Sequence, residues 1–172
     1  ATNRFTEGRD MIAFQIKGHI KGKSIVEQYI VSILRELNIH RLRKSFILVE
    51  FTSRLADEAL GVCVGDENFA VVTVARNSGW RPLSYQERMQ ILAHELVHAK
   101  QFLRGELGYN CAGDWRWKNR NAGGYKYENQ PWEKEATRLE KPLFDKCFPT
   151  NQLRGDRANQ STKGRDIVPR GT

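Results

Sequence analysis

The stretch from Ser84 to Leu103 constrains the fold more than any other part of the chain, because it has the pattern of one long helix. Pro82 interrupts the segment before it, and Ser84 and Glu87 match the S-x-x-E capping box that begins many helices. No Gly or Pro follows before Gly105. Apolar residues recur at spacings of three and four, which predicts a core-facing stripe made of Tyr85, Met89, Leu92, Leu96, Ala99 and Leu103.

Within this helix, residues 94 to 98 have the sequence His-Glu-Leu-Val-His. Positions four apart lie on one helical face about one turn from each other, so the imidazoles of His94 and His98 can bind one metal ion with Glu95 beside them. A solvent-facing polar stripe would produce this spacing only by coincidence in a chain with four histidines. The motif therefore predicts a zinc site of the hydrolytic type on the face opposite the apolar stripe.

The third metal ligand is predicted to be a carboxylate. Catalytic zinc usually has three protein ligands and one open position. The other histidines, His19 and His40, lie upstream, and none follows His98. The best candidates are Glu133 and Glu135, near the start of a second predicted helix. They lie about 200° apart around a helix, so only one can face the metal, and either would also be favoured there by the helix dipole alone.

A family resemblance adds to this prediction. The His-Glu-x-x-His segment, followed downstream by a helix in which Glu133 stands three residues before Ala136, resembles the gluzincin zinc metallopeptidases, especially compact single-domain members of bacterial and phage genomes. The resemblance implies a zincin-like fold with one Zn²⁺ per chain, held by the two histidines and Glu133. Thr137 stands where larger members often carry an aspartate that orients a histidine, so Thr137 or a backbone carbonyl is expected to do so here.

The resemblance also implies a reaction, the hydrolysis of a peptide bond in a protein or peptide substrate without a covalent intermediate. Glu95 would act as general base toward a zinc-activated water and then protonate the leaving amine. Tyr125 and Tyr127, just before the Glu133 helix, are candidates for the second donor to the oxyanion. The strand predicted at Phe69–Ala75 would form an edge that binds an extended peptide by backbone pairing.

The remaining patterns predict an α+β fold, in which a small antiparallel or mixed sheet packs on an N-terminal helix, the 84–103 helix and a C-terminal helix that carries the Glu ligand. The predicted helices and strands lie at residues 24–37, 46–51, 60–64, 69–75 and about 131–147. Turn residues at 65–68 predict an antiparallel hairpin. Pro142 predicts a break or kink in the last helix, and residues 105–130 are expected to form a long irregular segment.

Residues 1–148 are expected to form one metallopeptidase domain. Residues 149–172 are expected to be a polar tail that is extended or held by other chains of an assembly. Trp115, Trp117 and Trp132 stand among Arg116, Lys118 and Arg120. We expect the tryptophans to anchor a loop, although this cluster can also line a cleft or stack nucleotides.

Composition limits the compartment and the partners. The net charge of +8 is spread along the chain, so nucleic acid is a possible partner but not the favoured one. Three widely spaced cysteines, Cys63, Cys111 and Cys147, argue against a disulfide framework and for a reducing compartment. No run of about eighteen apolar residues is present. We expect a soluble cytoplasmic chain without membrane or recognisable export signal, or a virion-associated one if it is phage-encoded.

Two other functions are compatible with the sequence. One is a structural or assembly protein of a phage particle that retains a zincin fold and a zinc site. The other is a nucleic-acid-associated zinc protease, for which the basic surface would recruit DNA or RNA. The presence of Glu95 favours an active enzyme over the structural alternative.

Overall fold

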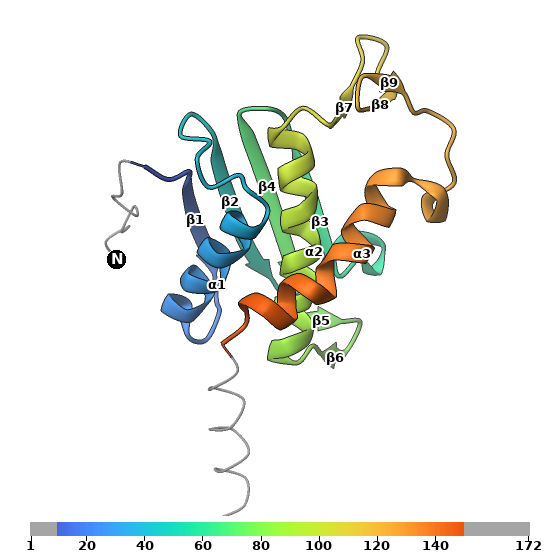
Figure 1. Ribbon diagram of the computed structural model, residues 1–172. Helices are drawn as coiled ribbons and strands as arrows, with labels where there is room; N and C mark the ends of the chain where they lie inside the picture. Colours follow the sequence, from blue (N-terminus) through green and yellow to red (C-terminus); the bar gives the residue numbers. More distant parts are fainter. Residues whose placement is uncertain (1–9, 150–172) are drawn as a thin grey trace, which may run out of the picture.

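The computed structural model describes residues 10–149. Its main body is a four-stranded mixed sheet with helices packed on one face (Figure 1). The sheet strands are β1 (Ala13–Gly18), β2 (Phe46–Thr52), β3 (Gly61–Gly65) and β4 (Phe69–Ala75). The helices are α1 (Lys23–Glu36), α2 (Tyr85–Leu103) and α3 (Pro131–Cys147). The predicted α+β class with a mixed sheet is therefore confirmed, whereas the expected tail lies almost entirely outside the described residues.

The strand order is β1-β2-β4-β3. Strands β1, β2 and β4 are parallel, and α1 makes the crossover between the first two, as parallel strands require. Their inward residues are in register, so that Phe14, Ile47 and Ala70 face the helices as one row. Strand β3 pairs antiparallel with β4, which follows it in the chain, and forms an edge of the sheet. This pairing confirms the predicted hairpin.

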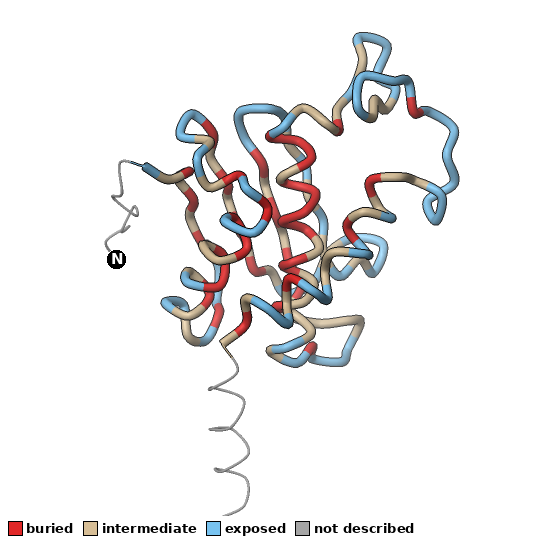
Figure 2. Tube along the Cα trace, viewed as in Figure 1, coloured by how far each residue is buried: buried red, intermediate tan, exposed pale blue. Residues whose placement is uncertain are grey.

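Helix α2 is buried along most of its length between the sheet and α3 (Figure 2). The predicted capping box is present: the backbone N–H of Glu87 donates to Ser84 Oγ at 3.1 Å, and the backbone N–H of Ser84 donates to the Glu87 carboxylate at 2.7 Å. Met89, Leu92 and Leu96 are fully buried in the main core. The start and the apolar stripe of this helix are as predicted.

Two predictions about the C-terminal half are wrong. Residues 105–130 are not irregular throughout, because they contain the small sheet β7 (Leu107–Tyr109), β8 (Trp115–Trp117) and β9 (Arg120–Asn121), followed by the short 3-10 helix η2 (Tyr127–Asn129). Strands this short carry no detectable alternation. Helix α3 runs through Pro142 without a break. Pro142 is exposed, so water can bind the carbonyl that lacks its helical partner.

The tryptophans pack together beside the small sheet rather than forming an open stacking platform. Trp132 is 3% exposed and forms a second small core with Phe102, Leu107 and Ala122. The rings of Trp115 and Trp117 lie 5.4 and 6.1 Å from that of Trp132. This cluster ties the β7–β9 segment to the start of α3, and it supports the expectation that the tryptophans anchor this loop.

The remaining elements of the described chain are short. They are the 3-10 helix η1 (Ala56–Glu58), which precedes β3, and the two-stranded hairpin of β5 (Asn77–Ser78) and β6 (Arg81–Pro82), which precedes α2. None of the helices within residues 10–149 is long and apolar enough to cross a membrane.

Candidate metal centre

Helices α2 and α3 bring three of the predicted ligands together. His94 and His98 lie one turn apart on α2, and their Nε2 atoms are 3.2 Å apart. The Glu133 carboxylate, in the first turn of α3, lies 3.4 Å from His94 Nε2 and 3.2 Å from His98 Nε2. All three side chains are at most 17% exposed. The ligand atoms lie within 4.8 Å of one another, so this group can hold a metal ion.

The other ring nitrogen of each histidine has a specific partner. His94 Nδ1 lies 2.8 Å from a carboxylate oxygen of Glu140, and His98 Nδ1 lies 2.8 Å from the amide oxygen of Gln101. Because both partners accept, each Nδ1 carries the proton, and each Nε2 lone pair is directed to the shared site. The expectation that Thr137 or a carbonyl would orient a histidine is wrong, since Thr137 is exposed and Glu140 makes this contact.

The geometry separates Glu133 from the alternative ligand, Glu135. The Glu135 carboxylate accepts from Gln101 Nε2 at 2.8 Å and from Lys100 Nζ at 3.3 Å, on the side of α3 away from the histidine pair. Gln101, which is fully buried, also donates to the backbone carbonyl of Trp132. Glu135 thus joins α2 to α3 through hydrogen bonds, and it is not part of the group that can hold a metal.

The carboxylates at the centre have perturbed acidities. Burial alone would raise the pKa of Glu133, but the adjoining imidazoles of His94 and His98, when they are protonated, outweigh it and hold the pKa well below its usual range. Glu95 is 6% exposed, and burial raises its pKa to about 7, although the two histidines would lower it when they are protonated. A carboxylate with this pKa can both accept and release a proton near neutrality.

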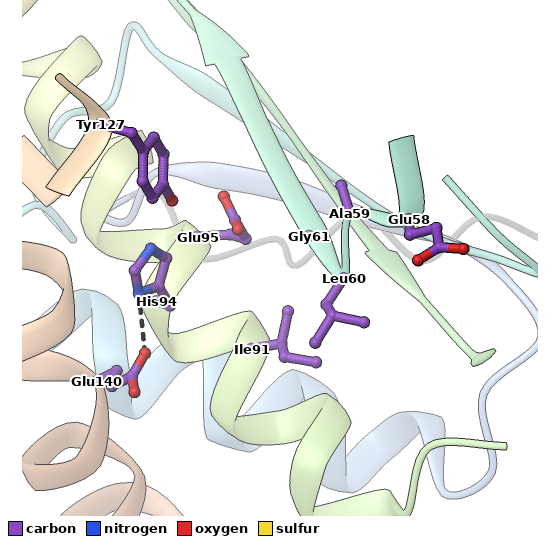
Figure 3. Close-up of a pocket in the computed structure, with 9 residues that line it drawn as sticks. All are labelled: Glu58, Ala59, Leu60, Gly61, Ile91, His94, Glu95, Tyr127 and Glu140. Atoms are coloured by element: carbon purple, nitrogen blue, oxygen red, sulfur yellow. Dashed lines mark hydrogen bonds and ion pairs between the residues drawn. The ribbon is translucent and has the colours of Figure 1, made fainter. Parts of the chain in front are cut away.

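A pocket of 420 Å³ opens beside these residues. Figure 3 shows His94, Glu95 and Tyr127 at one end of it, next to the edge strand β3. A Cβ atom at Gly61 of β3 would lie 2.5 Å from the Glu95 carboxylate. Only glycine lets this strand approach the acid so closely.

Of the two candidate tyrosines, only Tyr127 reaches the site. Its hydroxyl donates to Glu133 at 2.9 Å, and burial, followed by this hydrogen bond, raises its pKa to about 12. The ring of Tyr125 packs edge-on against Trp132 instead, and Tyr125 does not line the pocket.

Sequence reasoning missed several residues of this site. Glu140 follows Glu133 by seven positions, which is two helical turns on the same face, so this spacing could have revealed it. Gln101 stands one turn after His98 and could have been found in the same way. Glu58 and Leu60, which also line the pocket, come from the chain before β3, and no local pattern connects them with α2.

No protein-family model matches the chain, and no curated protein matches it either. The interpretation of the centre therefore depends on its own geometry.

Proposed function

We propose that the protein is a zinc-dependent metallopeptidase, with His94, His98 and Glu133 as ligands and Glu95 as general base. The spacing of the ligand atoms carries this proposal. Four-coordinate zinc with bonds of about 2.0–2.1 Å needs ligand atoms about 3.3 Å apart. The two Nε2 atoms are 3.2 Å apart, and the two oxygens of the Glu133 carboxylate lie one beside each imidazole, 3.2 Å from His98 Nε2 and 3.4 Å from His94 Nε2.

The chemistry of the donors also fits zinc. Two neutral imidazoles and one carboxylate are the ligand set of several catalytic zinc sites, and three protein ligands leave a position open. The partners on both Nδ1 atoms already select the tautomers that a metal needs. In this proposal α2, α3 and the mixed sheet correspond to a zincin-like fold.

When bound, zinc supplies Lewis-acid chemistry, since it lowers the pKa of water and polarises the scissile carbonyl. Glu95, beside the ligands at the pocket wall, accepts the proton of the attacking water and then delivers it to the leaving amine. The hydroxyl of Tyr127, which lies at Glu133, is the donor proposed for the developing oxyanion, whereas Tyr125 packs on Trp132 and does not line the pocket.

The peptide itself is proposed to pair with β3. The sequence had suggested the Phe69–Ala75 strand as the binding edge, and this is wrong, because β4 lies between β2 and β3 inside the sheet. Strand β3 has a free edge and passes directly beside Glu95 at Gly61. An extended peptide added there would have its backbone next to the general base.

The Glu95→Gln variant tests the proposal. We expect one zinc per chain by native mass spectrometry in both the wild type and Glu95→Gln, and a loss of peptide hydrolysis of at least about 100-fold in the variant. His94→Ala should lose the metal. Glu36 is an exposed carboxylate on α1 that pairs with Lys146, and Glu36→Gln should change neither the zinc content nor the rate of hydrolysis.

Two outcomes would contradict the proposal. If protein prepared without chelators holds no zinc, the proposed metal centre is ruled out. If the zinc-loaded wild type hydrolyses a broad peptide library no faster than Glu95→Gln does, the result favours the alternative function. In that alternative, the chain is a structural or assembly protein that retains a zinc site.

A further inference from the structure

The pocket beside the metal centre has an acidic far end. Figure 3 shows the side chains of Leu60 and Ile91 between the His94 and Glu95 end of the pocket and the carboxylate of Glu58. The pocket thus has an apolar middle and a carboxylate beyond it.

Glu58 is an exposed acid that lines one end of this pocket. Three carboxylates line it, those of Glu58, Glu95 and Glu140, and no Lys or Arg does. Glu140 is bonded to His94, and Glu95 has the role of general base. Within residues 10–149, Glu58 has neither an ion-pair partner nor a hydrogen-bond partner for its side chain, so it is available to a ligand.

The backbone that presents Glu58 is strained. Asp57 and Glu58 have φ values of 54° and 55°, both in the left-handed region. This conformation is unfavourable for a residue with a side chain, and such strain collects at functional sites. The second of these two residues, Glu58, lines the pocket, and Ala59 separates it from Leu60, which also lines the pocket.

A lysine or arginine side chain matches these features. Its methylene groups can pack on Leu60 and Ile91, and its cationic head can then reach a carboxylate at the end of the stem. An acidic side chain would be repelled by the three pocket carboxylates, and a purely apolar one would make no ion pair with Glu58.

We propose that this pocket selects substrates with a lysine or arginine next to the scissile bond, and that Glu58 is the residue that recognises the cationic head. The inference rests on the proposed peptidase function and adds a substrate class to it. Glu58 is a specificity residue, so its loss should change the preference between peptides and leave the hydrolytic step intact.

Matched peptides test this inference. Quenched fluorescent peptides that differ only in the residue on either side of the cleaved bond would carry Lys, Arg, Met or Glu. We expect the wild type to favour Lys over Met by roughly 5- to 50-fold in kcat/KM, as for one charge-assisted hydrogen bond. Glu58→Gln should reduce this ratio to about one without slowing cleavage of the Met peptide, and Glu58→Lys should favour the Glu peptide.

Asp57→Asn is the matched control. Asp57 shares the strained turn, is exposed and does not line the pocket. The preference of Asp57→Asn for the Lys peptide over the Met peptide should therefore equal that of the wild type. Hydrolysis of the Lys and Met peptides at equal rates by the wild type would overturn the inference and leave the proposed function standing.

Binding without turnover separates the two proposals. Calorimetry with zinc-loaded Glu95→Gln should show tighter binding of the Lys peptide than of the Met peptide, and the added Glu58→Gln change should remove the difference. If no peptide is hydrolysed, the proposed function fails, but this binding difference still supports recognition by Glu58. Equal binding of both peptides would overturn it.

Discussion

Each proposed ligand has a supporting contact of its own. Glu140 accepts from His94, Gln101 accepts from His98, and Tyr127 donates to Glu133. Contacts of this kind orient the ligand and commonly contribute 10- to 100-fold to metal affinity. The affinity of the centre should therefore depend on residues that never touch the metal.

Glu140→Gln should weaken zinc binding by roughly 10- to 100-fold, because an amide is a poorer acceptor for the His94 N–H than a carboxylate. A competition titration with a zinc chelator measures this. Asp145→Asn, on the same helix but paired with exposed Lys141, is the matched control and should bind zinc as the wild type does. An unchanged affinity in Glu140→Gln would contradict this support role.

Glu133→Gln and Glu135→Gln should affect different properties of the protein, zinc binding and thermal stability respectively. We expect Glu133→Gln to lose most zinc binding, because it removes the anionic ligand. Glu135→Gln should keep the metal but lower the thermal midpoint, because it weakens the bonds to Gln101 and Lys100. Metal analysis and thermal unfolding of both variants measure this, and a Glu135→Gln protein without zinc would contradict the assignment.

At the scale of the element, α2 holds the histidine pair in place through its start as well as its packing. The capping box satisfies orphan backbone donors at the N-terminus, and Arg81 of β6 binds the Glu87 carboxylate from outside the helix. The Arg81 hydrogen bond first, and then the backbone N–H of Ser84, lower the pKa of Glu87 to about 2.

This lowered pKa predicts a pH-dependent stability. A carboxylate whose folded pKa lies below its unfolded value stabilises the fold above the unfolded pKa, which is about 4.3 for Glu. That contribution should fall as the pH drops from about 5 toward 2. The urea midpoints of wild type and Glu87→Gln should therefore differ at pH 6 and converge at low pH.

Arg81→Gln is the control for this effect, because it removes the largest cause of the shift. In the Arg81→Gln background, the difference in urea midpoint between proteins with Glu and Gln at position 87 should depend less on pH. A difference that stays constant from pH 6 to pH 3 would show that the Glu87 charge has no such role.

At the scale of the whole molecule, the candidate centre joins the two main helices. Two ligands come from α2 and one from α3, and α3 reaches its position through the β7–β9 segment and the tryptophan cluster (Figure 1). A metal ion in this place would add to the packing of the two helices and to the hydrogen bonds between them, which include His94 with Glu140 and Gln101 with Glu135.

Metal removal should therefore loosen the packing of α3 on α2. At a free zinc concentration 1,000 times its Kd, binding to the folded state adds about 4 kcal/mol to stability. We expect a chelator to lower the thermal midpoint and to increase amide hydrogen exchange in α3 more than in α1. The chelator should not change the thermal midpoint or the hydrogen exchange of His98→Ala. A zinc-dependent shift in His98→Ala equal to that of the wild type would show that zinc stabilises the protein at another site.

Features that depend on neighbours along the chain could be predicted from the sequence. The capping box, the apolar stripe and the placing of His94 and His98 on one helical face all follow from the periodicity of a helix, and the β3–β4 hairpin follows from its turn residues. The α+β class followed from the same local patterns. The absence of a histidine after His98 also led to the prediction of an acidic third ligand.

Which distant groups meet depends on tertiary packing. The rotation of α3 against α2 turns Glu133 and Glu140 toward the histidines and leaves Glu135 with Gln101. Among the described residues, strand pairing puts β3 at one edge of the sheet, and the chain before it supplies Glu58. These outcomes depend on packing between elements far apart in the sequence, for which local periodicity holds no information. The histidine pair was therefore visible in the sequence, and the pocket around it was not.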